Sequence, residues 1–118
     1  MGYIISALVS AWDKAKMIRA RKSIDAQWVK RDEIFGPLFF GSASNFTEKF
    51  DVDEDPQEII IDFKESRIVD MSALEALKKM NDRYALLGKR MALRNVSDEG
   101  LRLIENTKGA VVLQILDK

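Results

Sequence analysis

The side chains available for chemistry are few in kind. The 118-residue sequence contains no cysteine and no histidine. This removes disulfide frameworks, thiolate nucleophiles, Ser-His-Asp and Cys-His catalysis, and the usual ligands of zinc and haem. Carboxylate, lysine, hydroxyl or magnesium chemistry remains. Because the sequence also contains no Walker A motif and no GxGxxG fingerprint, no standard phosphate cradle supports nucleotide hydrolysis. We therefore expect no enzyme activity, no cofactor and no metal site.

Two groups of carboxylates could still take part in chemistry. The alternating aspartates of residues 51–55 imitate the start of a calcium loop, but Pro56 stands where the loop needs glycine and Asp62 where it needs glutamate. We interpret this run as a solvated acidic loop. Asp62 and Asp70 bracket the end of an isoleucine-rich stretch and could pair as acid and base, although nothing distinguishes them from structural carboxylates.

A hydroxyl group lies at the start of the longest predicted helix. Ser72 and Glu75 have the spacing of a capping box, in which the serine oxygen accepts a hydrogen bond from a helix amide and the glutamate reaches back. The free amides and the dipole of a helix N-terminus also favour an added phosphate. The residue types leave both interpretations open, a structural cap or a phosphorylated regulatory position.

These residues must be positioned by an alternation of strands and helices. A β-branched run over residues 57–63 predicts a central strand covered on both faces. A helix is predicted over residues 72–87, and Gly88 follows where helices commonly end. The apolar face of this helix consists of Leu74, Leu77, Met80, Tyr84 and Leu87.

The rest of the chain predicts shorter elements. The turn-forming residues 35–38 separate two extended stretches, which predicts a β-hairpin. Residues 42–50 fit a short helix capped by Ser42 or Ser44. A strand over residues 91–96, a helix begun by Ser97 and a strand over residues 111–116 complete the set. Helical crossovers make the later strands parallel, so we predict an α/β fold, a mixed sheet of four to five strands with helices packed on it.

The net charge of zero conceals a segregated layout. Residues 1–31 carry seven basic and two acidic groups, residues 32–70 three and eleven, and residues 71–118 nine and six. The balances are therefore +5, −8 and +3. A neutral total argues against nucleic acid as the main partner, because nonspecific binding needs a dominant basic face.

Residues 3–22 predict an amphipathic, basic helix. Its apolar run, residues 3–12, is about half the roughly 20 residues that a membrane span requires. No basic stretch precedes this run, which argues against a signal peptide. The basic residues that follow are Lys14, Lys16, Arg19, Arg21 and Lys22. They suit the cytoplasmic edge of an anionic membrane. The alternative is a solvated helix that packs on its own domain.

Two motifs of this sequence resemble the STAS domain. This fold is shared by bacterial anti-sigma-factor antagonists and the cytoplasmic C-terminal domains of sulfate-permease (SulP) anion transporters. Residues 36–43, GPLFFGSA, are similar to a hairpin signature of the transporter branch. Residues 70–74, DMSAL, are similar to the strand-to-helix junction of the family. Ser72 occupies the position that is phosphorylated in the antagonist branch, but Met71 and Ala73 replace the serine and glycine found beside it there.

The resemblance implies a STAS-like fold over residues 23–118, preceded by a linker helix over residues 1–22 that follows a membrane domain. It implies a non-catalytic regulatory domain of a bacterial secondary sulfate or related anion transporter, at the cytoplasmic face of the inner membrane. The implied partners are the transmembrane domain, the anionic membrane surface, and cytosolic regulatory proteins or a second copy of the chain.

The resemblance also implies where contacts occur. Ser72 is the phosphoacceptor-like position. The residues expected to form a docking surface around the helix N-terminus are Asp70, Met71, Ala73, Glu75 and Ser97. A freestanding regulator of the anti-sigma-factor antagonist class is the main alternative function, and a weak nucleotide-binding module is a further one.

Overall fold

The computed structural model describes residues 18–116 of the chain. These residues form strands and helices in alternation. In chain order they are β1 (Arg19–Ile24), β2 (Val29–Leu38), α2 (Ala43–Glu48), β3 (Glu58–Ile68), α3 (Met71–Leu86), β4 (Arg90–Arg94), α4 (Asp98–Asn106) and β5 (Gln114–Leu116). Among these residues no helix is long and apolar enough to cross a bilayer.

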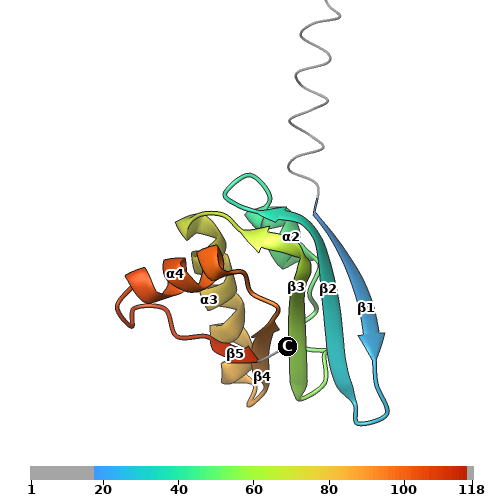
Figure 1. Cartoon of the computed structure of the whole chain (residues 1–118). Coiled ribbons are helices and arrows are strands. Elements are labelled where there is room, and N and C mark those ends of the chain that lie inside the picture. The colour runs from blue at the N-terminus through green and yellow to red at the C-terminus, as the bar shows by residue number, and fades with distance from the viewer. Residues whose placement is uncertain (1–17, 117–118) are drawn as a thin grey trace, which may run out of the picture.

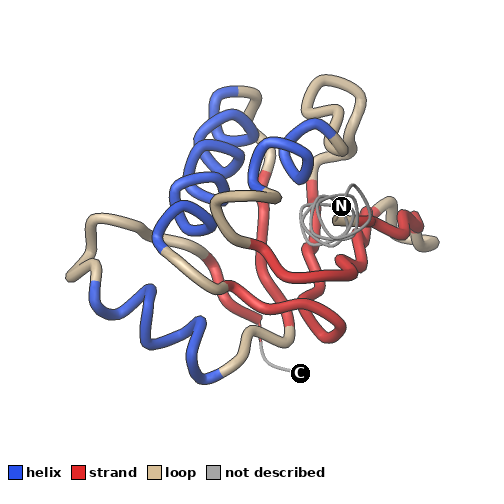
Figure 2. The backbone as a smooth tube through the Cα atoms, turned by 90° about the horizontal axis from the view of Figure 1, so that it is seen from above, coloured by secondary structure: helices blue, strands red, loops and turns tan. Residues whose placement is uncertain are grey.

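The five strands form one mixed sheet with the order β1-β2-β3-β4-β5. The β1–β2 pair is antiparallel, and each later pair is parallel. Figure 1 shows β3 between β2 and β4, with α3 and α4 beside it. Seen from above in Figure 2, the longest helix and the short helix before it lie together on one side of the strands. The predicted α/β fold with an N-terminal hairpin and later parallel strands is confirmed.

The core lies between the sheet and α3. The isoleucine-rich strand β3 contributes Ile59, Ile61 and Phe63, all buried. From α3 come the buried residues Leu74, Leu77, Met80 and Tyr84, as the helical spacing predicts. Leu87 is different, because α3 ends at Leu86 and Leu87 is its exposed C-cap. Gly88 follows with φ of 73°, a conformation that glycine adopts without strain.

The hairpin exists, but its predicted turn is wrong. The turn is at residues 25–28, and Gly36 and Pro37 lie inside β2, where they pair with β3. The carbonyl of Leu38 faces β3 and accepts a hydrogen bond from Val69 N (2.9 Å). The backbone nitrogen of Pro37, one residue earlier, therefore points to the opposite side of β2, where β1 pairs. The ladder with β1 reaches only Phe35, so no β1 residue stands opposite Pro37. Proline has no backbone N–H, but no hydrogen bond between strands is lost at this position.

The last four residues of the helix predicted over residues 3–22 form part of a strand instead. Residues 19–22 belong to β1, and residues 1–17 lie outside the described part of the chain. The ladder from Arg19↔Phe35 to Ile24↔Lys30 explains the difference, because pairing with β2 satisfies backbone groups that a helix would otherwise satisfy. The basic residues Arg19, Arg21 and Lys22 are exposed on this edge strand.

Several strands and helices start or end at one edge of the sheet. The parallel strands β2, β3 and β4 all end at this edge, so the residues that follow them lie close together. The antiparallel strand β1 begins there, because Arg19 pairs with Phe35 near the end of β2. We call this the carboxyl edge. It carries the starts of β1, α3 and α4.

Candidate functional site

The junction between β3 and α3 is organised by Asp70. Its Oδ1 atom accepts a hydrogen bond from Ala73 N (3.0 Å), and its Oδ2 atom accepts one from Phe40 N (3.0 Å). Asp70 is thus the N-cap of α3 and also fixes the loop that follows β2. The predicted capping box of Ser72 and Glu75 is wrong, because the helix begins at Met71, before Ser72. Asp70, two residues before Ser72, accepts the hydrogen bond from the free amide of Ala73.

Ser72 instead lines a groove between α2 and α3. The groove has a volume of about 300 Å³ and is lined by Ala43, Ser44, Thr47, Ser72, Glu75, Ala76, Lys79, Met80 and Arg83. Three hydroxyl groups and two cationic side chains therefore surround it. Ser72 is half-buried, and no side-chain bond ties it to the helix terminus. Ser72 thus shares this groove with the cationic Lys79 and Arg83 and with the anionic Glu75.

Apolar side chains surround Asp70 at the carboxyl edge. Phe40 has 63% of its surface exposed, and Val69 and Met71 are about half exposed. Together we call Phe40, Val69 and Met71 the apolar edge patch. Ala73, which the sequence places in the docking surface, is fully buried in the core instead. Ala73 is on the buried face of α3, the face that packs against the sheet.

Ser97 caps α4, as the sequence predicts. Its Oγ atom accepts a hydrogen bond from Gly100 N (3.2 Å). Ser97 lines a hollow of about 620 Å³ with Lys64, Asn95, Val96 and Asp98. Ser72 lines a different groove, so the two serines share the carboxyl edge but not one pocket.

Asp62 has a structural environment. It is buried and accepts hydrogen bonds from Arg31 Nη2 (2.5 Å), Asn95 Nδ2 (2.9 Å) and Lys64 N (2.9 Å). Burial raises the pKa of Asp62, but the three hydrogen bonds outweigh burial and lower the pKa below its ordinary value. Asp70 is occupied by capping. The two carboxylates therefore have separate structural partners rather than the arrangement of an acid and its base.

The acidic loop is partly buried, which corrects the solvated loop expected from the sequence. Asp55 accepts hydrogen bonds from Lys30 Nζ (2.6 Å) and from Tyr84 Oη (2.5 Å) inside the domain. Asp51 and Asp53 are exposed. Burial, and then the hydrogen bond to Asp55, raise the pKa of Tyr84. Within the described residues, no group of three or more carboxylates is arranged to hold a metal ion.

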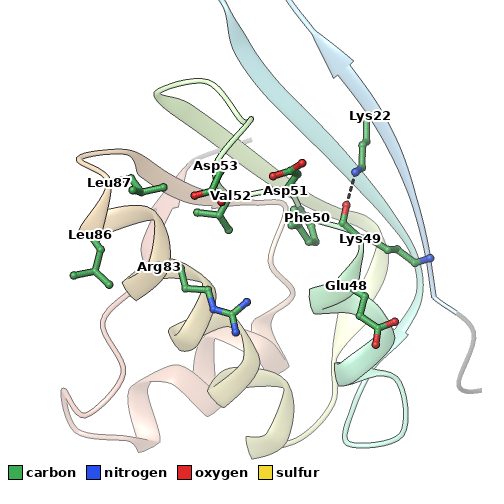
Figure 3. A pocket seen from close by; sticks show the side chains of 10 residues that line it. All are labelled: Lys22, Glu48, Lys49, Phe50, Asp51, Val52, Asp53, Arg83, Leu86 and Leu87. Atoms are coloured by element: carbon green, nitrogen blue, oxygen red, sulfur yellow. Dashed lines mark hydrogen bonds between the residues drawn. The ribbon is translucent and has the colours of Figure 1, made fainter.

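A second hollow lies where β1, the end of α2 and the end of α3 meet. This cleft of about 650 Å³ is drawn in Figure 3. Its lining residues are Lys22, Glu48, Lys49, Phe50, Asp51, Val52, Asp53, Arg83, Leu86 and Leu87. Lys22 donates a hydrogen bond to the backbone oxygen of Lys49, which ties β1 to the end of α2.

The predicted basic linker residues do not form one group. Lys14 and Lys16 lie outside the described residues. Arg19 and Arg21 lie on β1, and their alternation with Lys22 directs them to the opposite face of the sheet from Lys22. Lys22 is thus on the face of the sheet where the 650 Å³ cleft lies, and it lines that cleft.

Comparison with known proteins identifies the fold family. The family model of the STAS domain matches residues 23–115. The chain belongs to the STAS domain family. No curated protein matches the sequence. Solved STAS structures therefore provide the comparison.

Three solved structures illustrate the range of relatives. A sulfate transporter family protein from Wolinella succinogenes is 26% identical (TM-score 0.61; 74% of this chain and 71% of that chain covered). The murine Slc26a9 anion transporter is 16% identical (TM-score 0.68), and this STAS chain spans 20% of its length while 89% of this chain is covered. An antisigma-factor antagonist STAS domain from Rhodobacter sphaeroides is 20% identical (TM-score 0.59; 65% and 85%). Both branches share the fold.

Sequence reasoning missed the apolar edge patch and the buried Lys30–Asp55–Tyr84 network. Phe40 and Met71 stand in motifs already noted, but their exposure depends on how the carboxyl edge is assembled. The network joins residues 25 and 29 positions apart. The sequence around Lys30 and Asp32, VKRDEIF, is a run of four charged residues and gives no local sign that two of them are buried.

Proposed function

We propose that this STAS domain is a non-catalytic regulatory and interaction domain of a bacterial secondary sulfate or related anion transporter. The proposal places it at the cytoplasmic face of the inner membrane. The observation that carries the proposal is the composition of the carboxyl edge. Ile18 and the start of β1, which basic and apolar residues precede in the sequence, lie at the same edge as the apolar edge patch.

This juxtaposition supports contact with a membrane domain. Ile18 directly precedes β1, whose first residue, Arg19, pairs with Phe35 close to the end of β2. Phe40, Val69 and Met71 are exposed at that edge, and exposed apolar groups that cluster mark interaction sites. Lys14 and Lys16, which precede Ile18 in the sequence, are residue types that suit an anionic lipid surface. The likeness to transporter STAS domains supports the same arrangement.

Cell fractionation tests this proposal. An antibody against residues 18–116 should detect, in the native organism, a membrane-bound polypeptide several times larger than the 13.5 kDa of this chain. A band of about the chain's own mass in the soluble fraction would contradict the proposal. In the membrane-bound protein, changing Met71 to Asp should lower the rate of anion uptake at equal abundance. Changing the exposed Lys78 to Asp, on the outer side of α3, is the matched control and should leave uptake unchanged.

A freestanding regulator of the anti-sigma-factor antagonist class is the second candidate. The half-buried hydroxyl of Ser72 lines the same α2–α3 groove as Lys79 and Arg83, which favours this candidate, because cations stabilise an added phosphate. Phosphate at Ser72 in protein purified from native cells, detected by mass spectrometry, together with a soluble band of the chain's own size, would support this candidate. A soluble chain that is never phosphorylated would count against it.

A further inference from the structure

Lys22, on the edge strand β1, has two acceptors within reach. It is exposed, and it donates a hydrogen bond to the backbone oxygen of Lys49, the C-cap of α2 (Figure 3). Lys22 is also the cross-strand partner of Asp32 on β2. Paired residues of an antiparallel ladder project from the same face with their Cβ atoms about 5 Å apart. The side chain of Lys22 is therefore long enough to reach the Asp32 carboxyl group instead.

The Asp32 carboxyl group is buried and poorly satisfied. Its side chain has 0% of its surface exposed, and neither oxygen has a hydrogen-bond partner within residues 18–116. Burying an ionised carboxylate without hydrogen bonds costs far more free energy than burying a neutral carboxyl group. The arrangement in the structure therefore suits the protonated form of Asp32. The ionised form needs a further donor.

The charged groups that face Asp32 identify this donor. On β2, Lys30 Nζ is 3.7 Å from Asp32, but its hydrogen bond of 2.6 Å goes to Asp55 of the acidic loop. On α3, the hydroxyl of Tyr84 also donates to Asp55. The β3 residue paired with Asp32 is apolar. Among these groups of the described chain, Lys22 is the cation that is not bonded to a carboxylate.

We infer that Lys22 and Asp32 form a proton-dependent latch between β1 and α2. While Asp32 is neutral, Lys22 bonds to the Lys49 carbonyl and ties β1 to the end of α2. When Asp32 gives its proton to solvent, the Lys22 ammonium leaves that carbonyl and donates to the new carboxylate, and the tie is released. Lys22 and Lys49 both line the 650 Å³ cleft, so the cleft changes shape on the β1 side when the latch opens.

Two further observations support this exchange. The ring of Phe50 has its centroid 6.0 Å from Lys22 Nζ and 5.7 Å from Lys30 Nζ, so it joins the surface lysine to the buried cluster. Burial raises the pKa of Asp32 to about 6, although Lys30 and Lys22 oppose the rise. The latch is therefore closed below about pH 6 and open above it. The inference rests on the folded domain and does not depend on the transporter context.

An NMR titration of the full chain from about pH 4 to 8 tests the latch. The carboxyl carbon of Asp32 reports its ionisation, and the carbonyl carbon of Lys49 reports the tie. In wild type both signals should change with one midpoint, near pH 6. Asp32→Asn, which cannot ionise, should leave the Lys49 signal constant across this range.

A variant of the lysine gives an independent test. Lys22→Met keeps the apolar stem and removes the ammonium, so the ionised Asp32 loses its donor and the Asp32 midpoint should rise by at least about half a pH unit. Arg21→Met is the matched control, because it removes one positive charge from the neighbouring position, which faces the other side of the sheet. It should leave the Asp32 midpoint nearly unchanged.

Several results would overturn the inference. One is an Asp32 signal that titrates while the Lys49 signal stays constant, which would show that Lys22 keeps its carbonyl partner. Another is a Lys49 signal that still titrates in Asp32→Asn. A third is equal Asp32 midpoints in Lys22→Met and Arg21→Met, which would show that the ammonium does not meet the carboxylate. This last comparison decides alone if Asp32→Asn fails to fold, because both of its substitutions are at exposed positions.

Discussion

The Nζ atom of Lys30 donates a hydrogen bond of 2.6 Å to Asp55, and both side chains are buried. A second buried carboxylate, Asp32, lies 3.7 Å from the same ammonium group. Neither oxygen of Asp32 has a hydrogen-bond partner within residues 18–116. One lysine thus compensates two carboxylates, and the buried cluster carries excess negative charge when both are ionised.

This cluster should make stability depend on pH. Burial raises the pKa of Asp32 from its ordinary value of 3.8 to about 6, with Asp55 adding to the rise and Lys30 and Lys22 opposing it. Between pH 3.8 and 6 the folded state therefore binds more protons than the unfolded state, so stability falls as pH rises through this window. The free energy of unfolding at pH 7 should be lower than near pH 4 by up to about 3 kcal/mol from this group.

Urea titrations of wild type and Asp32→Asn at several pH values measure this effect. The variant should lose the slope between pH 4 and 6, and the exposed Asp51→Asn should keep it. Asp62 does not contribute in this window, because its lowered pKa gives stability that is lost only when pH falls below 3.8. A wild-type stability that is constant from pH 4 to 7 would refute the assignment.

Asp70→Ala should destabilise the domain by about 0.5–2 kcal/mol, because it removes the cap of α3 and the bond to Phe40 N. Ser72→Ala, two residues away, should change stability by less than about 0.5 kcal/mol, because Ser72 makes no cap bond. Chemical denaturation of both variants compares them. Equal losses would mean that Ser72 shares the capping role.

Leu77→Ala should destabilise the domain by about 2–5 kcal/mol, since Leu77 is fully buried between α3 and the sheet. Leu86→Ala in the same helix removes an exposed side chain and should cost less than about 0.5 kcal/mol. The difference in denaturant midpoints is the measurement. A Leu77→Ala loss below about 0.5 kcal/mol would show that this face is not the core.

Removing Lys14 and Lys16 by a double change to alanine should weaken sedimentation of the full chain with anionic vesicles, and added salt should weaken wild-type binding. Lys78 and Lys79 on α3 provide a control that removes the same charge and should have little effect. Truncation before Ser23 is unsuitable, because it deletes buried Ile18 and most of β1. Equal binding by both double variants would show that the N-terminal lysines do not direct the chain to lipid.

The sequence by itself determined the elements whose signals are local. The apolar face of α3 repeats with the period of a helix, and Gly88 supplies the positive φ that ends it. Ser97 stands directly before an amphipathic segment and caps it. The β-branched run of β3 fits only a covered central strand. These features, with alternating strands and helices, were sufficient to predict the α/β class and the parallel later strands.

Only the tertiary structure decided the features that depend on distant pairing. Residues 19–24 form a strand because β2 lies alongside, and their exposed side chains carry no strand period. Pro37 fits inside β2 because the ladder with β1 stops at Phe35, two residues before it. Asp70 caps α3 in place of Ser72 because its carboxylate also reaches Phe40, 30 positions away. Such contacts are set by chain segments that meet only after folding, so the local sequence could not specify them.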